Sequence, residues 1–125
     1  MILTFSDKRF PNLILQKVKI HTIREDKSSR WRIGNKIEFW MHNPRNVNLH
    51  PYQFATSHLR EKKPILIHPE LNKVTVDNVL INSVKGLNSL AVNDGFENWD
   101  HMKTFFTKPF SGYLLVWSQE WLRPF

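Results

Sequence analysis

The sequence predicts a mainly β domain with flanking helices, an α+β fold. Segments that alternate apolar with polar residues, or that are rich in β-branched residues, recur along the chain and are typical of strands. A few shorter segments instead place apolar residues at helical spacing beside a capping residue. The 125 residues, of which 41% are hydrophobic, suit one compact domain over residues 1–125.

The first part of the chain is expected to form one helix and two strands. Residues 7–16 predict a short helix, in which Pro11 is tolerated because it lies near the first turn. Residues 18–24 alternate with a period of two and predict a strand. Gly34 marks a turn before a second strand over residues 36–41, where apolar and charged residues alternate.

The middle of the chain contains the least regular segment. Residues 42–64 are rich in proline and asparagine and predict an elaborated loop with a short strand near 52–56. The charged run Arg60–Lys63 is interpreted as part of this solvated loop. After it, residues 65–67 and 74–84 predict strands rich in β-branched residues.

The last third of the chain is expected to contain two helices and a strand. Ser89 is a plausible N-cap for a helical turn over residues 90–94, which Gly95 ends as the C′ residue. Residues 98–106 predict a second helix that Asn98 caps, and residues 113–117 predict the last strand.

Composition limits the partners and cofactors. Eighteen Lys and Arg against eleven Asp and Glu give a net charge of +7, which favours nucleic acid as the partner; a protein that is merely basic and soluble is the alternative. The absence of cysteine excludes disulfides, thiolate zinc sites and cysteine nucleophiles. The amino terminus lacks an apolar signal segment and no apolar run is long enough to span a membrane, so a cytoplasmic location without membrane association is expected.

Six histidines raise the question of a metal site. None forms a His-Glu-x-x-His pair, and no cysteine is present to assist them. No metal and no other cofactor is therefore expected, and a contact between His21 and a ligand is the more plausible role for a histidine.

The densest group of functional side chains is Lys19-Ile20-His21-Thr22-Ile23-Arg24-Glu25-Asp26. It places an amine, a hydroxyl, a guanidinium and two carboxylates within eight residues. Because Lys19 and Thr22 are three residues apart, a regular strand points them to opposite faces. If the two act together, the backbone has to bend or bulge between them.

Two further residues leave alternatives open. Arg24 can pair with Glu25 or Asp26, or it can hold a phosphate or a carbonyl group. Trp31 can stack on a nucleobase or belong to the core. The other tryptophans in apolar patterns are expected to be structural, namely Trp40, Trp99 and Trp117.

Four short motifs follow one another over about residues 5–118: Lys19-x-x-Thr22-Ile23-Arg24, Trp31-x-x-Gly34, Leu90-Ala91-x-x-Asp94-Gly95-Phe96 and Phe110-x-Gly112-Tyr113-Leu114-x-x-Trp117. Together they resemble the ASCH domain, the activating signal cointegrator homology family of the PUA-like superfamily. The resemblance implies a PUA-like β-barrel with flanking helices and a cleft that binds RNA or modified nucleosides. The ligand-binding residues that follow are Lys19, His21, Thr22, Arg24, Trp31 and Asp94.

Some small bacterial ASCH proteins are amidohydrolases that remove the acetyl group from N4-acetylcytidine. The resemblance then implies a catalytic set of Lys19, Thr22 and Asp94, in which the lysine activates the threonine hydroxyl. The family carries glutamate where this chain has Asp94, and a carboxylate misplaced by about 1 Å can cost on the order of 100-fold in rate.

Three functions are therefore predicted as alternatives. The favoured one is an ASCH-like domain that binds RNA or a modified nucleoside, because aspartate replaces glutamate and no other catalytic set is visible. The second is an amidohydrolase that uses the same residues. The third is a protein-interaction module whose aromatic carboxyl-terminal residues, Trp121 and Phe125, dock on another protein.

Overall fold

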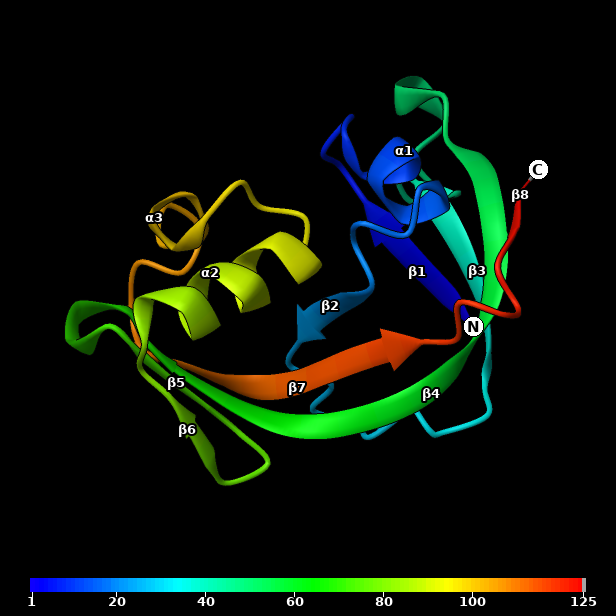
Figure 1. Cartoon of the computed structure of the whole chain (residues 1–125). Helices are drawn as coiled ribbons and strands as arrows, with labels where there is room; N and C mark the ends of the chain where they lie inside the picture. The colour runs from blue at the N-terminus through cyan, green and yellow to red at the C-terminus, as the bar shows by residue number, and fades with distance from the viewer. Residues whose placement is uncertain (125) are drawn as a thin grey trace.

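Strand β4 (Tyr52–His68) is the longest strand of the computed structural model, which describes residues 1–124, and it curves along one side of the molecule (Figure 1). The described residues also form seven further strands and three α-helices, so the prediction of a mainly β fold with flanking helices is confirmed. The other strands are β1 (Ile2–Phe5), β2 (His21–Arg24), β3 (Lys36–Met41), β5 (Lys73–Val76), β6 (Val79–Ile81), β7 (Phe110–Trp117) and β8 (Arg123–Pro124). The helices are α1 (Phe10–Leu15), α2 (Val84–Asn93) and α3 (Trp99–Met102).

Strand β4 belongs to two parts of the sheet. Its first half pairs with β3 and β8, and its second half pairs with β7 on one side and β5 on the other. The register shifts between Leu59 and Glu61, where a bulge at Arg60 lets the strand turn from one part to the other. Every pairing of β4 is antiparallel. Within the described residues, the pair of β1 with β3 is parallel.

The sheet does not close into a barrel, which corrects the expectation of a closed β-barrel. Within residues 1–124, β1 pairs only with β3 and β2 only with β7, so these two strands are free edges. In place of a backbone ladder, the Arg24 side chain of β2 donates from Nη2 to the Thr4 carbonyl of β1 at 2.8 Å. A side chain between two edge strands keeps their backbones too far apart to pair.

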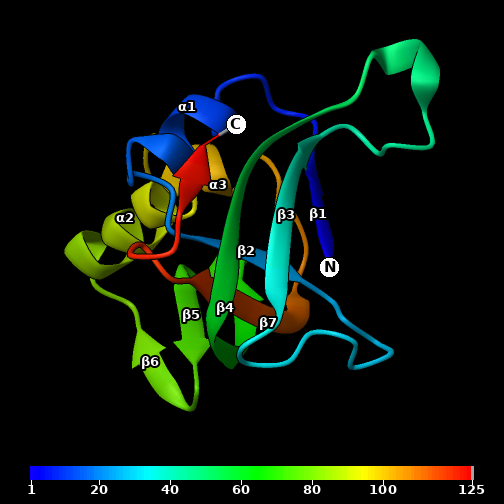
Figure 2. The same cartoon turned by 90° about the vertical axis from the view of Figure 1, so that its right-hand side faces the viewer.

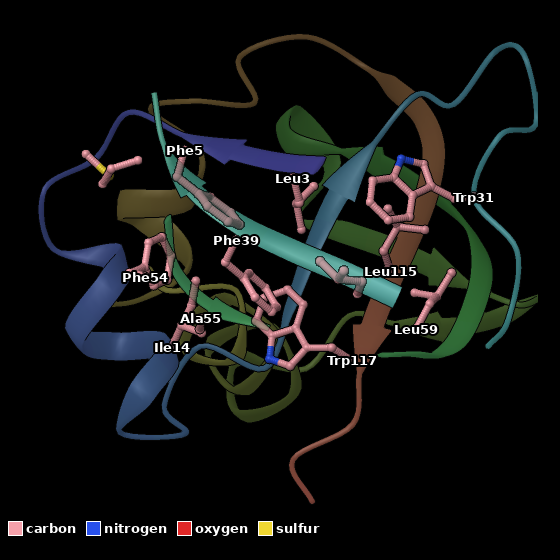
Figure 3. Close-up of a cluster of buried hydrophobic side chains, with 12 residues drawn as sticks. Leu3, Phe5, Ile14, Trp31, Phe39, Phe54, Ala55, Leu59, Leu115 and Trp117 are labelled. Atoms are coloured by element: carbon pink, nitrogen blue, oxygen red, sulfur yellow. The ribbon is translucent and has the colours of Figure 1, made fainter. Parts of the chain in front are cut away.

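Two hydrophobic cores lie on opposite faces of β7. The first fills the space between β7 and the β1–β3–β4 part of the sheet, and Figure 3 shows Phe39 packed against Trp117, with ring centroids 5.0 Å apart. The second lies between β7 and the helices α2 and α3. Trp99 and Trp117 are buried as predicted, whereas Trp40 is half-buried.

The expectation of a loop over residues 42–64 is wrong for most of these residues. Only the first ten residues are irregular, with a 3-10 turn at Val47–Leu49, and Figure 2 shows this segment projecting beyond β3 and β4. The strands expected near 52–56 and at 65–67 are parts of β4. The run Arg60–Lys63 lies on β4 at its bulge. The alternation of apolar and polar residues is interrupted there, so the sequence does not indicate a strand.

Residues 74–84 form a hairpin and the start of a helix instead of one strand. Asp77 and Asn78 both have positive φ and connect β5 to β6, as in a type I′ turn. Helix α2 begins earlier than expected, because Ser83 is its N-cap and accepts a hydrogen bond from the Gly86 N–H at 3.0 Å. Ser89 therefore lies inside the helix.

The other helix ends agree better with the sequence. Gly95 follows α2 with φ +97°, as predicted for a C′ residue. Asn98 caps α3 by accepting from the His101 N–H at 2.8 Å, although the helix ends at Met102 instead of residue 106. No helix within residues 1–124 is long and apolar enough to cross a membrane.

Candidate ligand-binding site

A cavity of about 180 Å³ lies at the seam between the free edges of β1 and β2, beside the end of α2. We call it the seam cavity. It brings together four of the six ligand-binding residues that the sequence suggests, from segments far apart in the chain. Its lining consists of Phe5, Phe10, Lys19, Thr22, Ile23, Arg24, Asp94, Phe96, Phe105 and Phe106.

The backbone bend that a joint role of Lys19 and Thr22 requires is present before β2. The N–H groups of Val18 and Lys19 both donate to the Leu13 carbonyl at the end of α1. The Ile20 N–H donates to the Asn93 carbonyl at the end of α2, at 2.8 Å. These contacts keep residues 18–20 out of the strand, which begins at His21. Lys19 and Thr22 are therefore not on one regular strand, and strand alternation does not place their side chains on opposite faces.

Lys19 is a buried cation, with 1% of its surface exposed. Its Nζ donates to the His21 carbonyl at 2.8 Å and to the Asp94 carbonyl at 2.5 Å, and it lies 3.6 Å from Asp94 Oδ1. The Asp94 carbonyl is at the carboxyl end of α2, where the helix dipole favours a positive charge. The ammonium also lies over the Phe10 ring, 4.5 Å from its centroid.

Burial changes the chemistry of this amine. Removal from water disfavours the charged form and lowers the pKa of Lys19 to about 8, although the negative charge of Asp94 opposes the shift. The positive charge of Arg24 lowers it further. Lys19 therefore exchanges a proton close to neutral pH, whereas an exposed lysine remains charged there.

Gly95 permits this close packing. A Cβ at this position would lie 2.9 Å from Lys19 Cδ and 2.9 Å from Phe10 Cε1, and the backbone has positive φ. Any side chain here is therefore strained and displaces the lysine.

Asp94 is held by His21 as well as by Lys19. His21 Nδ1 lies 2.9 Å from Asp94 Oδ1, and both side chains are buried. An ionised carboxylate only accepts hydrogen bonds, so His21 carries its proton on Nδ1 in that state. His21 does not line the cavity and instead orients the carboxylate that does.

Thr22 and Arg24 project from β2 into the seam. Thr22 is buried, and its hydroxyl accepts a long contact of 3.4 Å from Arg24 Nε. Burial lowers the pKa of Arg24, with Asp94 opposing the shift, and the guanidinium lies 5.3 Å from the centroid of the Phe5 ring. Arg24 pairs with neither neighbouring acid, because Lys27 contacts Glu25 and Lys62 contacts Asp26.

Trp31 is not part of the cavity. It is 6% exposed and belongs to the first core, where Figure 3 shows it beside Leu59 and Leu115. Of its two alternative roles, the core role is the one the structure shows, so this indole is not available for stacking.

The phenylalanines of the cavity were missed by sequence reasoning. Phe105 is 61% exposed, and its ring centroid lies 5.0 Å from that of Phe96. Helix α3 ends at Met102, before Phe105 and Phe106, so the helical spacing expected through residue 106 could not place these two side chains.

A larger groove of about 510 Å³ lies beside the seam cavity and shares Phe96 with it. Its rim carries Arg9, whose charge Asp7 neutralises at 2.7 Å, and two neutral amides, Asn12 and Gln16. We favour the seam cavity as the site because its polar groups are buried and oriented.

Within residues 1–124, no group of three His, Asp or Glu side chains is placed to hold a metal ion. The exposed Trp121 lies against His58, with ring centroids 4.9 Å apart, while Phe125 lies outside the described residues. Comparison with known protein families, curated protein sequences and solved structures finds no match to this chain.

Proposed function

We propose that the chain is an ASCH-like, PUA-like domain whose seam cavity binds one unpaired nucleobase, from RNA or from a modified nucleoside. The observation that carries the proposal is a single small cavity that combines aromatic walls with Thr22, Arg24 and Asp94. These are the two kinds of contact by which proteins hold an extruded base.

The size of the cavity limits the ligand. At about 180 Å³ it is smaller than the ~300–1,000 Å³ typical of sites that enclose a drug-sized molecule. A single heterocyclic ring suits this volume, and a ribose or a second base remains outside. Stacking on an aromatic wall contributes about 1–3 kcal/mol for one base.

The polar groups suit the edge of a pyrimidine. The Arg24 guanidinium supplies donors, the Thr22 hydroxyl supplies a donor and an acceptor, and Asp94 Oδ2 has no hydrogen-bond partner within residues 1–124. A base that presents both a carbonyl and an amino or amide N–H satisfies all three.

Calorimetric titration with cytidine and N4-acetylcytidine tests this proposal. Thr22→Val keeps the shape of the side chain but removes its hydroxyl, so binding should weaken about 5- to 10-fold, the effect of one neutral hydrogen bond. Thr75→Val on β5 is the matched control and should bind like the wild type. Equal affinities for the two variants, or no binding of either nucleoside, would refute the proposal.

A second candidate is amide hydrolysis in the same cavity, and the lowered pKa of Lys19 favours it. A neutral amine donates to the carbonyls of His21 and Asp94 and retains a lone pair that can accept a proton. Thr22 Oγ1 would attack the acyl carbon as its proton passes to Lys19. The C–N bond would then break as the lysine returns the proton to the leaving nitrogen, and water would hydrolyse the acyl-threonine ester.

Binding remains the first proposal because Lys19 Nζ and Thr22 Oγ1 share no hydrogen bond within the described residues. Product formation from N4-acetylcytidine, measured from about pH 6 to about pH 10, distinguishes the two candidates. An enzyme of this kind gains rate as Lys19 loses its proton, and both Thr22→Val and Lys19→Met abolish turnover. Turnover that survives either substitution would refute this mechanism.

A further inference from the structure

The segment between β2 and β3, residues 25–35, begins directly after Arg24 of the seam cavity. Figure 2 shows it extending outward from the end of β2 before it returns to β3. We call it the basic loop because it carries three exposed cations, Lys27, Arg30 and Arg32. Lys36, the first residue of β3, is a fourth exposed cation directly after the loop.

The acidic residues of the basic loop do not cancel this charge. Asp26 is turned inward, with its side chain fully buried, and its carboxylate is neutralised by Lys62 at 2.6 Å. Glu25 faces Lys27 at 3.3 Å, but the two side chains are 54% and 86% exposed, so solvent screens their contact. The outer surface of the loop thus presents three cations and one carboxylate, and Lys36 follows at the start of β3.

Hydrogen bonds fix the shape of the basic loop. Asp26 accepts from the Arg30 N–H at 3.0 Å and from the Trp31 N–H at 3.2 Å, which closes residues 26–31 into one turn. Lys62 also donates to the Trp31 carbonyl at 2.9 Å, and the indole is buried in the core. The loop therefore loses little conformational entropy when an anion binds its cations.

A second turn holds the rest of the loop against β4. The Arg32 N–H donates to Asn35 Oδ1 at 2.7 Å, and the Gly34 N–H donates to the Leu59 carbonyl at 2.7 Å. The cations of the loop are thus supported by a folded backbone at both ends.

The start of the basic loop is close to the cavity. Lys27 is three residues after Arg24, so the chain separates them by at most about 10–11 Å. We propose that the basic loop binds the phosphates that flank the base in the seam cavity, so that the ligand is a single-stranded nucleic acid. This inference rests on the proposed function, because the captured base determines where its phosphates lie.

Two variants of equal charge test this inference. The loop variant combines Lys27→Gln, Arg30→Gln and Arg32→Gln. The control variant combines Lys85→Gln, Arg45→Gln and Arg123→Gln, which are exposed positions on α2, in the segment before the 3-10 turn and on β8. Each variant loses one lysine and two arginines, so only the location of the lost charge differs.

The probe is a fluorescently labelled, cytidine-rich single-stranded RNA of roughly ten nucleotides. Anisotropy titrations from about 50 mM to about 200 mM salt give the slope of log K against log salt concentration. Each phosphate contact on a single strand contributes about 0.7 to this slope, so the loop variant should lose about 2 and the control variant less than about 0.5. Circular dichroism verifies that both variants are folded.

The outcomes separate this inference from the proposed function. If nucleoside binding is sensitive to Thr22→Val but the two charge variants show equal slopes, the basic loop is not the phosphate site and the inference is wrong. If neither nucleoside binds the wild type, the proposed function fails first. Equal affinity and equal loop dependence for double-stranded RNA would refute the requirement for a single strand.

Discussion

Replacing Lys19 with methionine should change how the stability of the protein depends on pH. The amine is buried among Phe5, Phe10 and Trp117, and methionine fits such an apolar site at similar length. Lysine carries a proton that the folded state holds more weakly than the unfolded state, whereas methionine carries none.

The sign and size of the effect follow from the pKa of Lys19. This pKa is about 8 in the folded protein against 10.5 as the ordinary value. Between these values the unfolded chain binds more protons, so the free energy of unfolding rises with pH. The difference between these two pKa values corresponds to about 3 kcal/mol in total, of which about 2 kcal/mol develops between about pH 7 and about pH 10.

Urea unfolding of both proteins across this pH range measures the effect. The free energy of unfolding of the wild type minus that of Lys19→Met should rise by about 2 kcal/mol, because every other ionisable residue is present in both proteins and its contribution cancels in the difference. Lys85→Met, at an exposed position on α2, is the control and should run parallel to the wild type. A difference between the wild type and Lys19→Met that is constant with pH would show that Lys19 titrates normally, and would refute its role as a proton acceptor.

Two further substitutions test the helix cap and the close packing at the seam. Ser83→Ala should lower the free energy of unfolding by about 1 kcal/mol through loss of the α2 cap, while Ser89→Ala should change it by less than about 0.5 kcal/mol; the reverse order would favour a helix start at Ser89. Gly95→Ala and Gly34→Ala both place alanine at positive φ, at a cost of about 1–2 kcal/mol, but thermal unfolding should show the larger loss for Gly95→Ala because only that Cβ meets Lys19 and Phe10. Equal losses would show that the lysine moves aside freely.

Local patterns predicted the elements whose burial alternates regularly. Strand β3 has the expected bounds because Ile37, Phe39 and Met41 face the first core while their neighbours remain outside. The sequence did not predict β4 as one strand. The bulge at Arg60 breaks the alternation of apolar and polar residues, and proline, as at Pro64, is more typical of a loop than of a strand. Strand β4 is stabilised by backbone pairing with strands on both of its sides, and a local sequence pattern does not show which distant segments pair with it.

The candidate site was predictable only in part for the same reason. Lys19, Thr22 and Arg24 are close in sequence, but the bend that brings Lys19 to the cavity depends on Asn93. Asp94 could be connected to them only through the order of the motifs, and its contact with His21 spans 73 residues. The inward position of Trp31 follows from the Asp26 turn, whose ion pair with Lys62 is also a long-range contact.

A crystal structure of the protein soaked with N4-acetylcytidine is the most direct test of whether the seam cavity binds a nucleobase. We expect the base inside the seam cavity, stacked on a phenylalanine wall and hydrogen-bonded to Thr22, Arg24 or Asp94, with the ribose outside. A nucleoside found instead in the groove beside α1, with the seam cavity unaltered, would contradict it.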